Sequence, residues 1–372
     1  MAIRTPAEVF PPGDFLREEL ETRGWTQIDL AEVLGRNVAL VNQIISGKRS
    51  ITPETARGLA AAFGTSPEFW LRLEQSYQLW RVRDKDATAI SRRAILYSSA
   101  PISDMMRRGW IEPSENVDVL EKRLLTFFGV NTIEEVQHPF AYAARKSTPY
   151  TQETTPSQRA WLARAKQIAQ SVRVAPYTAN SVENALARLR LLAHTAEETR
   201  HVSKVLSENG IRFVVVEPLA GTKIDGACFW FNGSPVIALS MRYNRIDNFW
   251  FTLMHELGHC SQQEVSLDSD LDTSKANTEK PESERNADEF ALKSLINPKD
   301  LDNFIARKRP LYSTQSIIAF AQTKNVHPGI VAGQLHYRGE LKWENFRKTL
   351  VQVREYVTSS ALTDGWGSVI SS

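Results

Sequence analysis

The sequence predicts an α+β protein that is mostly helical and has four consecutive parts. Residues 1–83 contain five short helical patterns separated by glycines and capping residues, and residues 84–204 continue with helical patterns only. Three β-branched and aromatic runs then precede a long helical pattern, which predicts a C-terminal domain over residues 205–358 with a small antiparallel sheet. Residues 359–372 end in a Gly- and Ser-rich stretch and predict a flexible tail.

The composition is that of a globular protein in a reducing compartment. The chain of 372 residues is 42% hydrophobic and 24% charged, and its cysteines are Cys228 and Cys260. Two cysteines provide no disulfide framework. The sequence has no apolar run of the roughly 18 residues that a membrane span needs. Its first residues also lack the apolar segment of a secretory signal. We therefore expect a cytoplasmic location and no membrane partner.

Helix start and stop signals place the five N-terminal helices in order. Gly24 and Gly35 end the first two helices, Thr26 and Asn37 can cap the second and third, and Thr52 begins the fourth. The predicted helices are Gly13–Arg23, Gln27–Leu34, Val38–Ile45, the helix that follows Thr52, and Glu68–Arg83.

The second and third of these helices fit a helix-turn-helix. Apolar residues at helical spacing would close the core between them, namely Leu30, Ala31, Leu34, Val41 and Ile44. The start of the third helix would present side chains to DNA bases, namely Asn37, Val38, Ala39, Asn42 and Gln43. Asn and Gln suit bidentate contact to adenine, while Val or Ala can contact a thymine methyl group. Residues placed for phosphate contacts are Gln27, Lys48, Arg49 and Ser50.

The net charge of residues 1–84 favours a protein-interaction domain over a DNA-binding domain. Residues 1–84 contain ten Lys and Arg against eleven Asp and Glu, so the net charge does not indicate DNA binding. A helical protein-interaction domain that has lost DNA binding would have the same balance. DNA binding stays the preferred interpretation, because a few basic residues on the DNA face suffice without a net charge.

Residues 11–83 resemble the HigA-type antitoxins of the XRE repressor family. The similarity rests on several short segments, namely Pro11-Pro12-Gly13, Gly24-Trp25-Thr26-Gln27, Ile44 to Arg49, Ile51 to Ala56, and Phe69-Trp70. The resemblance implies binding to double-stranded operator DNA. Such repressors usually bind as dimers on paired half-sites, and whether this chain forms a homodimer stays open.

Beyond residue 205 the pattern changes from helices to strands. Three runs predict strands, namely Ile211–Val216, Gly226–Phe231 and Pro235–Ser240. Asn232-Gly233, between the last two runs, is a hairpin turn signal. Two predicted helices follow, Arg245–Gln263 and Glu282–Ile296, joined by the polar loop Asp268–Pro281. Further helices are predicted to about residue 358. The middle region shows no catalytic pattern and has one predicted loop, Lys146–Ser157, before a helical part, Gln158–Leu206.

His255 and His259 form an HExxH pattern with Glu256 between them. The spacing i, i+4 places both imidazoles on one face of a helix, where they can bind the same zinc ion, Zn²⁺. Glu256 can reach a water molecule on that zinc, act as general base and later pass the proton to the leaving amine. Glu284, on the next predicted helix, is the candidate third ligand. Asp288, one turn later, can fix the tautomer of a ligating histidine.

Several choices at this site stay open. Glu282 is a rival third ligand, and Glu284 is preferred because only Glu284 has the aspartate partner. Cys260 points about 100° away from its neighbour His259, so a buried packing thiol is preferred over a ligand. A peptidase also needs a donor for the developing oxyanion, and the candidates are Arg242, Tyr243, His327, His336 and Tyr337. A chance HExxH on an ordinary amphipathic helix is the alternative to the whole site.

Residues from about 205 to 340 resemble the ImmA/IrrE metallopeptidase family. The segments that carry the similarity are Asp225 to Trp230, Pro235 to Ser240, Phe251 to His259, and Glu284 to Pro298. The resemblance implies a gluzincin-type fold, with a twisted sheet over the active-site helix and zinc as the cofactor. It also implies cleavage of a repressor protein in a stress, phage or mobile-element response. It assigns His255, His259 and Glu284 as zinc ligands and Glu256 as the catalytic glutamate.

Three hypotheses describe the whole chain. The first is a DNA-bound regulator whose zinc endopeptidase domain cleaves a repressor, an antitoxin-like partner or the chain itself. The second is a transcription factor whose zincin domain serves only as a sensor or scaffold. The third is an antitoxin that neutralises a toxin by contact and represses its own operon. Glu256 favours the first over the second, because a scaffold needs no general base, and the third accounts for only the first quarter of the chain.

Overall fold

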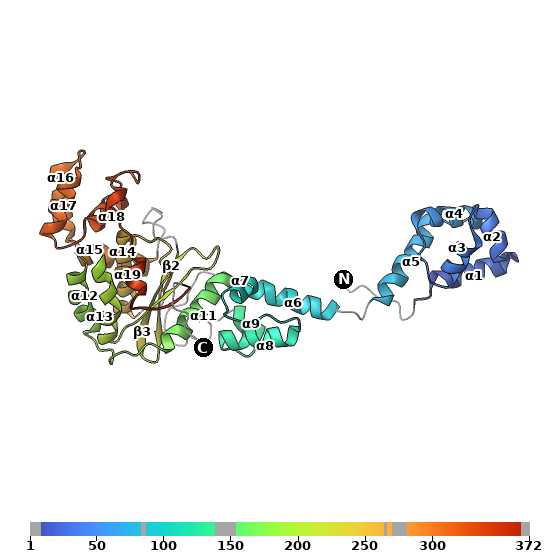
Figure 1. The fold of residues 1–372 in the computed structure, drawn as a ribbon, viewed down its shortest axis with the longest axis horizontal. Coiled ribbons are helices and arrows are strands. Elements are labelled where there is room, and N and C mark those ends of the chain that lie inside the picture. The colour runs from blue at the N-terminus through green and yellow to red at the C-terminus, as the bar shows by residue number, and fades with distance from the viewer. Residues whose placement is uncertain (1–8, 83–86, 138–153, 264–265, 270–280, 366–372) are drawn as a thin grey trace. The chain divides into compact units, whose positions relative to one another are not determined.

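The computed structural model describes residues 9–82, 87–137, 154–263, 266–269 and 281–365. Its contacts divide the chain into two compact units, Met1–Arg92 and Arg93–Ser372 (Figure 1). The second unit takes in the helical residues 93–204 together with the region that contains the sheet. None of the described helices is both long enough and apolar enough to cross a membrane.

The first unit consists of helices with local caps. They are α1 (Pro12–Arg23), α2 (Gln27–Leu34), α3 (Val38–Ile45), α4 (Pro53–Phe63) and α5 (Pro67–Arg81). A capping box starts α2, because the Thr26 hydroxyl accepts from the Asp29 backbone amide and the Asp29 carboxylate accepts from that of Thr26. Gly24 and Gly35 end α1 and α2 in the left-handed conformation.

One buried core closes the helix-turn-helix. It joins α2 to α3 through Leu30, Ala31, Val41 and Ile44, with the partly buried Leu34 packed against it. Gly13 lets α1 lie against α3, since a Cβ at this position would come within 2.4 Å of the Ile45 carbonyl oxygen. The two helices of the motif are therefore held in a fixed mutual arrangement.

The second unit begins with helices that the sequence predicts only in part. They are α6 (Ala87–Ser99), which spans the division, α7 (Ile102–Arg107), α8 (Val117–Phe128), α9 (Ile133–Gln137), α11 (Pro156–Gln170), α12 (Ser181–Leu192), η1 (Glu197–His201) and α13 (Val202–Glu208). The helical part predicted over Gln158–Leu206 is interrupted by residues 172–178, which form neither helix nor strand. Most of the predicted loop Lys146–Ser157 lies outside the described residues, and its last two residues begin α11.

A five-stranded mixed sheet forms the centre of this unit. Its strands are β1 (Arg212–Val216), β2 (Ile224–Phe231), β3 (Ser234–Leu239), β4 (Ser266–Ser269) and β5 (Leu362–Asp364), in the order β4-β2-β3-β1-β5. The predicted hairpin joins β2 to β3, with Asn232 and Gly233 both at positive φ.

The prediction of an antiparallel sheet is wrong. β1 runs parallel to both β3 and β5, whereas β2 pairs antiparallel with β3 and β4. After β1 the chain passes the neighbouring place in the sheet and forms β2 one position farther out, so the hairpin returns β3 beside β1 in the parallel sense. No local signal in the sequence specifies this order.

Two segments predicted as irregular contain strands. Residues 362–364 were expected in a flexible tail, but they form β5, and Thr363 and Asp364 are buried there. The Arg164 guanidinium of α11 lies 2.6 Å from the Asp364 carboxylate, which ties this edge strand to the helical layer. In the predicted loop Asp268–Pro281, Asp268 and Ser269 belong to β4, and residues 270–280 lie outside the described part of the chain.

Helices cover both faces of the sheet (Figure 1). Phe213 and Val215 of β1 share a core with α14 (Ile246–Gln262). Successive side chains of a strand point to opposite faces, so Val214 and Val216 face the other side. There α11 packs, with its Trp161 indole donating to the Val216 carbonyl at 2.9 Å. Because both faces are covered, the described strands are buried almost throughout.

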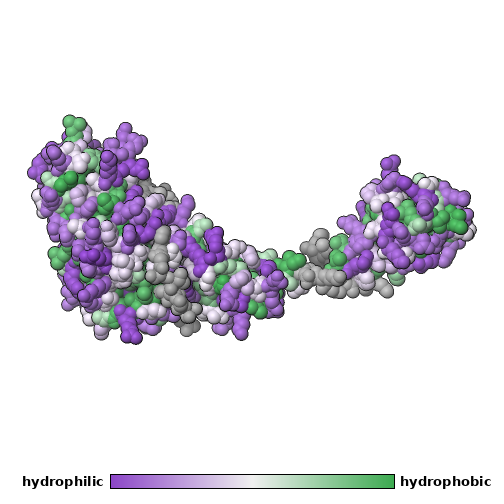
Figure 2. All heavy atoms as spheres, viewed as in Figure 1, coloured by the Kyte–Doolittle hydropathy of each residue, from purple (hydrophilic) through white to green (hydrophobic). Residues whose placement is uncertain are grey.

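The remaining helices follow α14 in the chain. They are α15 (Glu282–Leu295), α16 (Pro298–Lys308), α17 (Thr314–Thr323), α18 (Pro328–Tyr337), η2 (Arg347–Thr349) and α19 (Arg354–Thr358). Of these, α15 and α18 pack directly against α14. On the outside, Figure 2 shows hydrophilic residues over most of the visible surface of both units, with hydrophobic residues in scattered small groups.

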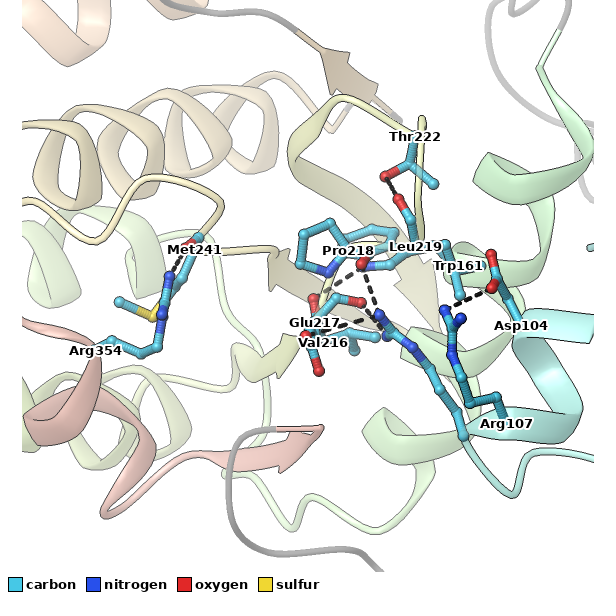
Figure 3. A network of polar contacts seen from close by, with 11 residues as sticks. Asp104, Arg107, Trp161, Val216, Glu217, Pro218, Leu219, Thr222, Met241 and Arg354 are labelled. Atoms are coloured by element: carbon cyan, nitrogen blue, oxygen red, sulfur yellow. Dashed lines mark hydrogen bonds and ion pairs between the residues drawn. The ribbon is translucent and has the colours of Figure 1, made fainter.

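A network of polar contacts fastens the early helices to the end of β1 (Figure 3). The Arg108 guanidinium, directly after α7, donates to the carbonyl oxygens of Glu217 and Pro218, both at 2.7 Å. Its neighbour Arg107 instead pairs locally with Asp104 and stays largely exposed. Arg108 therefore has a structural position inside the second unit.

Candidate functional site

The two histidines of the HExxH pattern lie on α14, the helix that crosses the sheet. His255 and His259 are one turn apart on one face, and their Nε2 atoms are 3.1 Å from each other. Both side chains are buried, because α14 is enclosed between the sheet and the surrounding helices. Two nitrogen donors thus converge on one point beside the helix.

Glu284 of α15 brings a carboxylate to the same point. Its Oε2 lies 3.3 Å from His255 Nε2, and its Oε1 lies 3.5 Å from His259 Nε2. The Glu284 side chain keeps a quarter of its surface exposed, so the cluster is accessible from one side. The rival residue Glu282 is exposed and does not belong to the cluster.

The three donors fit a zinc ion. Their candidate ligand atoms all lie within 4.8 Å of one another. Bonds of about 2.0–2.1 Å in tetrahedral geometry would separate ligand atoms by about 3.4 Å, close to the three separations found here. Two imidazoles and one carboxylate are a donor set that zinc takes in catalytic sites, with a fourth position left open.

Asp288 supports the cluster from behind. Its Oδ1 lies 3.0 Å from His255 Nδ1, and the aspartate is 4% exposed. A proton on Nδ1, which faces this carboxylate, would leave the lone pair of Nε2 directed toward Glu284 and His259. Glu284 and Asp288 stand one turn apart on α15, so both contacts come from a single helical face.

Glu256 occupies a place made by a glycine. The Glu256 side chain is fully buried and lies against Gly226 of β2, where an added Cβ would fall 2.2 Å from Glu256 Oε1. Any larger residue at position 226 would displace this carboxylate. The sequence analysis gave Gly226 no such part, although a glycine inside a strand signals a close approach.

A second glycine lets the two helices of the site approach each other. A Cβ at Gly258 would come within 3.2 Å of the Ala287 Cα and 3.3 Å of the Phe290 Cβ. Small residues on both helices therefore bring α15 close enough for Glu284 to meet the histidines. The sequence analysis did not single out Gly258 or Ala287 for this close packing.

The candidates for an oxyanion donor have very different surroundings. The Arg242 guanidinium makes two 3.1 Å contacts with the Asp225 carboxylate. His327 caps α18 by accepting from the Gly329 amide, and burial lowers the pKa of its imidazole. His336 contacts the Asn345 carbonyl, with its pKa also lowered by burial.

The two tyrosine candidates contact different groups. Tyr243 lies under the guanidinium groups of Arg242 and Arg245. Tyr337 packs on Phe251, whose ring in turn contacts the His255 imidazole. Tyr337 is thus linked through one ring to a histidine of the cluster.

Cys260 points away from the histidine cluster and toward the sheet. Its Sγ lies 3.2 Å from the Sγ of Cys228 on β2, and both side chains are fully buried. Near them, the Tyr177 hydroxyl donates to the Cys260 carbonyl, and burial, as the largest cause, raises the pKa of Tyr177 to about 12. The position of Cys260 is that of a packing thiol.

The candidate DNA contacts lie on the surface of the first unit. The exposed residues among them are Asn37, Val38, Ala39, Asn42, Gln43, Lys48, Arg49 and Ser50, while Gln27 is half-buried. Asn37 also caps α3, because its Oδ1 accepts from the Ala39 amide at 2.8 Å. The Asn42 amide donates to the Gln27 Oε1 at 3.3 Å, which links the two helices of the motif across their exposed side.

Two family models match the chain. The helix-turn-helix model covers residues 16–70, and the IrrE N-terminal-like domain, a peptidase family model, covers residues 208–332. The second match spans β1 to α18 and so includes the histidine cluster.

Curated relatives match the first unit. The antitoxin HigA-1 of Vibrio cholerae is 39% identical over 83 residues, which cover 22% of this chain and 75% of that protein. An uncharacterised helix-turn-helix transcriptional regulator of Haemophilus influenzae is 38% identical over 81 residues, covering 22% and 73%.

Solved structures match the same region. A HigA-family addiction module antidote protein of Coxiella burnetii is 37% identical, with a TM-score of 0.22, and the match covers 24% of this chain and 94% of that one. The Pseudomonas aeruginosa antitoxin HigA with the higBA promoter is 30% identical, with a TM-score of 0.22, covering 22% and 91%. On the family models and the curated relatives, the chain belongs to the HigA-type helix-turn-helix proteins through its N-terminal unit and also carries an IrrE-like peptidase-family domain.

Proposed function

We propose that the chain is a DNA-binding transcriptional regulator with a zinc-dependent endopeptidase domain. Its substrate would be a repressor- or antitoxin-like protein, or the chain itself, in a stress, phage or mobile-element response. The observation that carries the proposal is the convergence of His255, His259 and Glu284, with the buried Glu256 next to His255 in the sequence of α14. The match to an IrrE-like peptidase-family domain supports the same activity.

Each residue of the site has a chemical task in this proposal. His255, His259 and Glu284 would hold Zn²⁺, which when bound polarises a carbonyl group and lowers the pKa of water. Glu256 would accept a proton from the attacking water on a carboxylate oxygen and hand it to the leaving amine nitrogen. Asp288 would keep His255 in the tautomer that presents Nε2.

The first unit would bring this activity to DNA. The exposed side chains at the start of α3 suit base contacts in the major groove, and Lys48 and Arg49 after the helix suit phosphates. The curated relative that is named an antitoxin supports a role in regulating an operon.

Metal analysis of the purified full-length chain tests the zinc site. We expect one zinc per chain in the natural protein and in Glu282→Ala, and loss of zinc in Glu284→Ala. The two variants are matched, because both remove a carboxylate from the first turn of α15. A folded natural chain without zinc would contradict the proposal.

Cleavage is tested with Glu256→Gln, which keeps the shape of the side chain but removes the base. Candidate partner proteins encoded near the gene would be incubated with the zinc-loaded chain and followed by mass spectrometry. We expect fragments with the natural chain and none with Glu256→Gln, because general-base catalysis contributes about 10²–10⁴-fold.

The second candidate function is a transcription factor or HigA-like antitoxin whose zincin domain senses or binds without catalysis. The similarity of the first unit to a protein named an antitoxin favours this function. Zinc binding with the same cellular response in the natural chain and in Glu256→Gln would select this function over proteolysis.

A further inference from the structure

A pocket opens beside the metal cluster, along the same pair of helices. It has a volume of about 270 Å³ and is walled by α14, α15 and the segment from α18 to Trp343. Its apolar walls include Phe251, Leu292, Leu295 and Ile330. An apolar cavity of about 150 Å³ already holds a benzene molecule. This pocket therefore has room for a large aliphatic or aromatic side chain.

The pocket and the cluster lie along the same two helices. α14 and α15 run antiparallel, because His259 meets Glu284 and His255 meets Asp288, while Phe251 and Leu292 wall the pocket together. Phe251 precedes His255 by one helical turn, and their ring centroids are 6.1 Å apart. The pocket thus begins one helical turn from the cluster.

Most polar groups of the pocket are occupied within the protein. The Asp247 carboxylate pairs with the Arg245 guanidinium at 3.2 Å. The Gln334 amide donates to the Leu292 carbonyl, and His336 contacts the Asn345 carbonyl through Nε2, while its buried Nδ1 has no hydrogen-bond partner in the described part of the chain. With these groups engaged, the space that remains suits an apolar occupant better than a charged one.

Asn248 also has hydrogen-bonding capacity left. It is among the residues that line the pocket and is 7% exposed, and no group in the described part of the chain forms a hydrogen bond with its side-chain amide. A polar group inside a protein normally has a partner, because leaving it without one costs free energy. An Asn amide offers a donor and an acceptor together, which matches the two polar groups of a peptide unit.

We propose that this pocket selects the peptide substrate, binding an apolar side chain next to the scissile bond while Asn248 bonds the backbone of that residue. The inference rests on the proposed endopeptidase function and adds the substrate class, a peptide with a large apolar residue beside the cleaved bond. Phe251 and Leu292 contact the side chain, and Asn248 fixes the peptide direction.

Calorimetry with small hydroxamates tests the pocket without any cleavage reaction. The probes are succinyl hydroxamates ending in a methylamide, with hydrogen, isobutyl or benzyl at the carbon that follows the zinc-binding group. We expect the zinc-loaded full-length chain to bind the isobutyl and benzyl compounds at least about ten-fold more tightly than the hydrogen compound. Equal Kd values for all three would overturn the inference.

Two variants of Leu292 test whether this pocket causes the tighter binding of the isobutyl and benzyl compounds. Leu292→Trp fills the pocket and Leu292→Ala removes one of its walls, so both reduce the ratio between the benzyl and hydrogen compounds. The Kd of the hydrogen compound stays the same. Leu191→Trp is the control, because it adds the same bulk at a residue that is 65% exposed and does not line the pocket. An unchanged ratio in both Leu292 variants contradicts the assignment of the pocket.

Asn248→Ala separates the backbone contact from the side-chain contact. We expect about a three- to ten-fold weaker Kd for all three compounds, with the ratio between them retained. No change in any Kd would remove Asn248 from the proposal. If the natural chain binds neither zinc nor any hydroxamate, the proposed function itself fails, and this result differs from equal binding of all three probes.

Discussion

The two candidate sites of the molecule are built in opposite ways. The candidate DNA surface belongs to one local motif, and its side chains are exposed and make few contacts with the rest of the chain. The metal cluster draws on α14 and α15, and its Glu256 lies against β2, so its residues are also part of the core. Substitutions at first-site residues whose side chains form no bond within the protein, such as Lys48, should change binding alone, whereas substitutions at the second site should change function and stability together.

Gly226→Ala should have the largest effect. The new Cβ would overlap the Glu256 carboxylate, so we expect loss of cleavage and about 1–3 kcal/mol lower free energy of unfolding, the usual cost of overpacking. Urea denaturation of the full-length chain measures the second quantity.

A double variant shows whether the clash with Glu256 is the cause. In a Glu256→Ala background the overlapping carboxylate is gone, so adding Gly226→Ala should cost much less. Equal costs in both backgrounds would mean that the strand, and not Glu256, rejects the methyl group.

Asp288→Ala should weaken zinc binding about 10–100-fold, because His255 loses the carboxylate that orients it. Competition with a chelator of known affinity measures the change. Glu289→Ala is the matched control, since this neighbouring acid is exposed and pairs with Lys293 on the surface. Similar losses in both variants would mean that overall negative charge, and not Asp288, matters.

Arg108→Ala should lower the free energy of unfolding by about 1–3 kcal/mol, because two backbone carbonyls lose their charged donor. Arg107→Ala removes the same group from an exposed neighbour and should stay within about 0.5 kcal/mol of the natural chain. Chemical denaturation of both variants gives the comparison, and equal effects would show that the bonds of Arg108 drawn in Figure 3 add nothing to stability.

Lys48→Ala should have the smallest effect and leave stability unchanged. If Lys48 contacts a phosphate, the slope of log K against log salt falls by about one unit for duplexes selected from random DNA. Fluorescence anisotropy at several salt concentrations measures this slope. An unchanged slope would mean that Lys48 does not contact a phosphate. A lower midpoint of thermal unfolding would contradict the expectation that this substitution leaves stability unchanged.

The same contrast explains which features the sequence could predict. Thr26, Gly35 and Asn37 act on their own helices through neighbours a few residues away, so the bounds of α2 and α3 follow from local rules. The i, i+4 spacing of His255 and His259 is equally local, and the pairing of Glu284 with Asp288 on one helical face rests on the same period.

Features that depend on distant partners could not be predicted in this way. The parallel pairing of β1 with β3 and β5 is set by the path of the whole chain, and residues 362–364 have little strand character of their own. The importance of Gly226 emerges only when Glu256, thirty residues later, is seen against it. Asn248 likewise can be recognised as a pocket residue only after α14, α15 and α18 have been placed around the pocket.

The pairing of β1 with β5 has a consequence for the time course of synthesis. At about 5–20 residues per second, a ribosome needs roughly 7–30 s to proceed from the end of β1 to the end of β5. The helix-turn-helix unit is complete well before then, because its contacts lie within the first 92 residues. During that interval a nascent chain can fold its DNA-binding unit while the sheet of the second unit still lacks an edge strand.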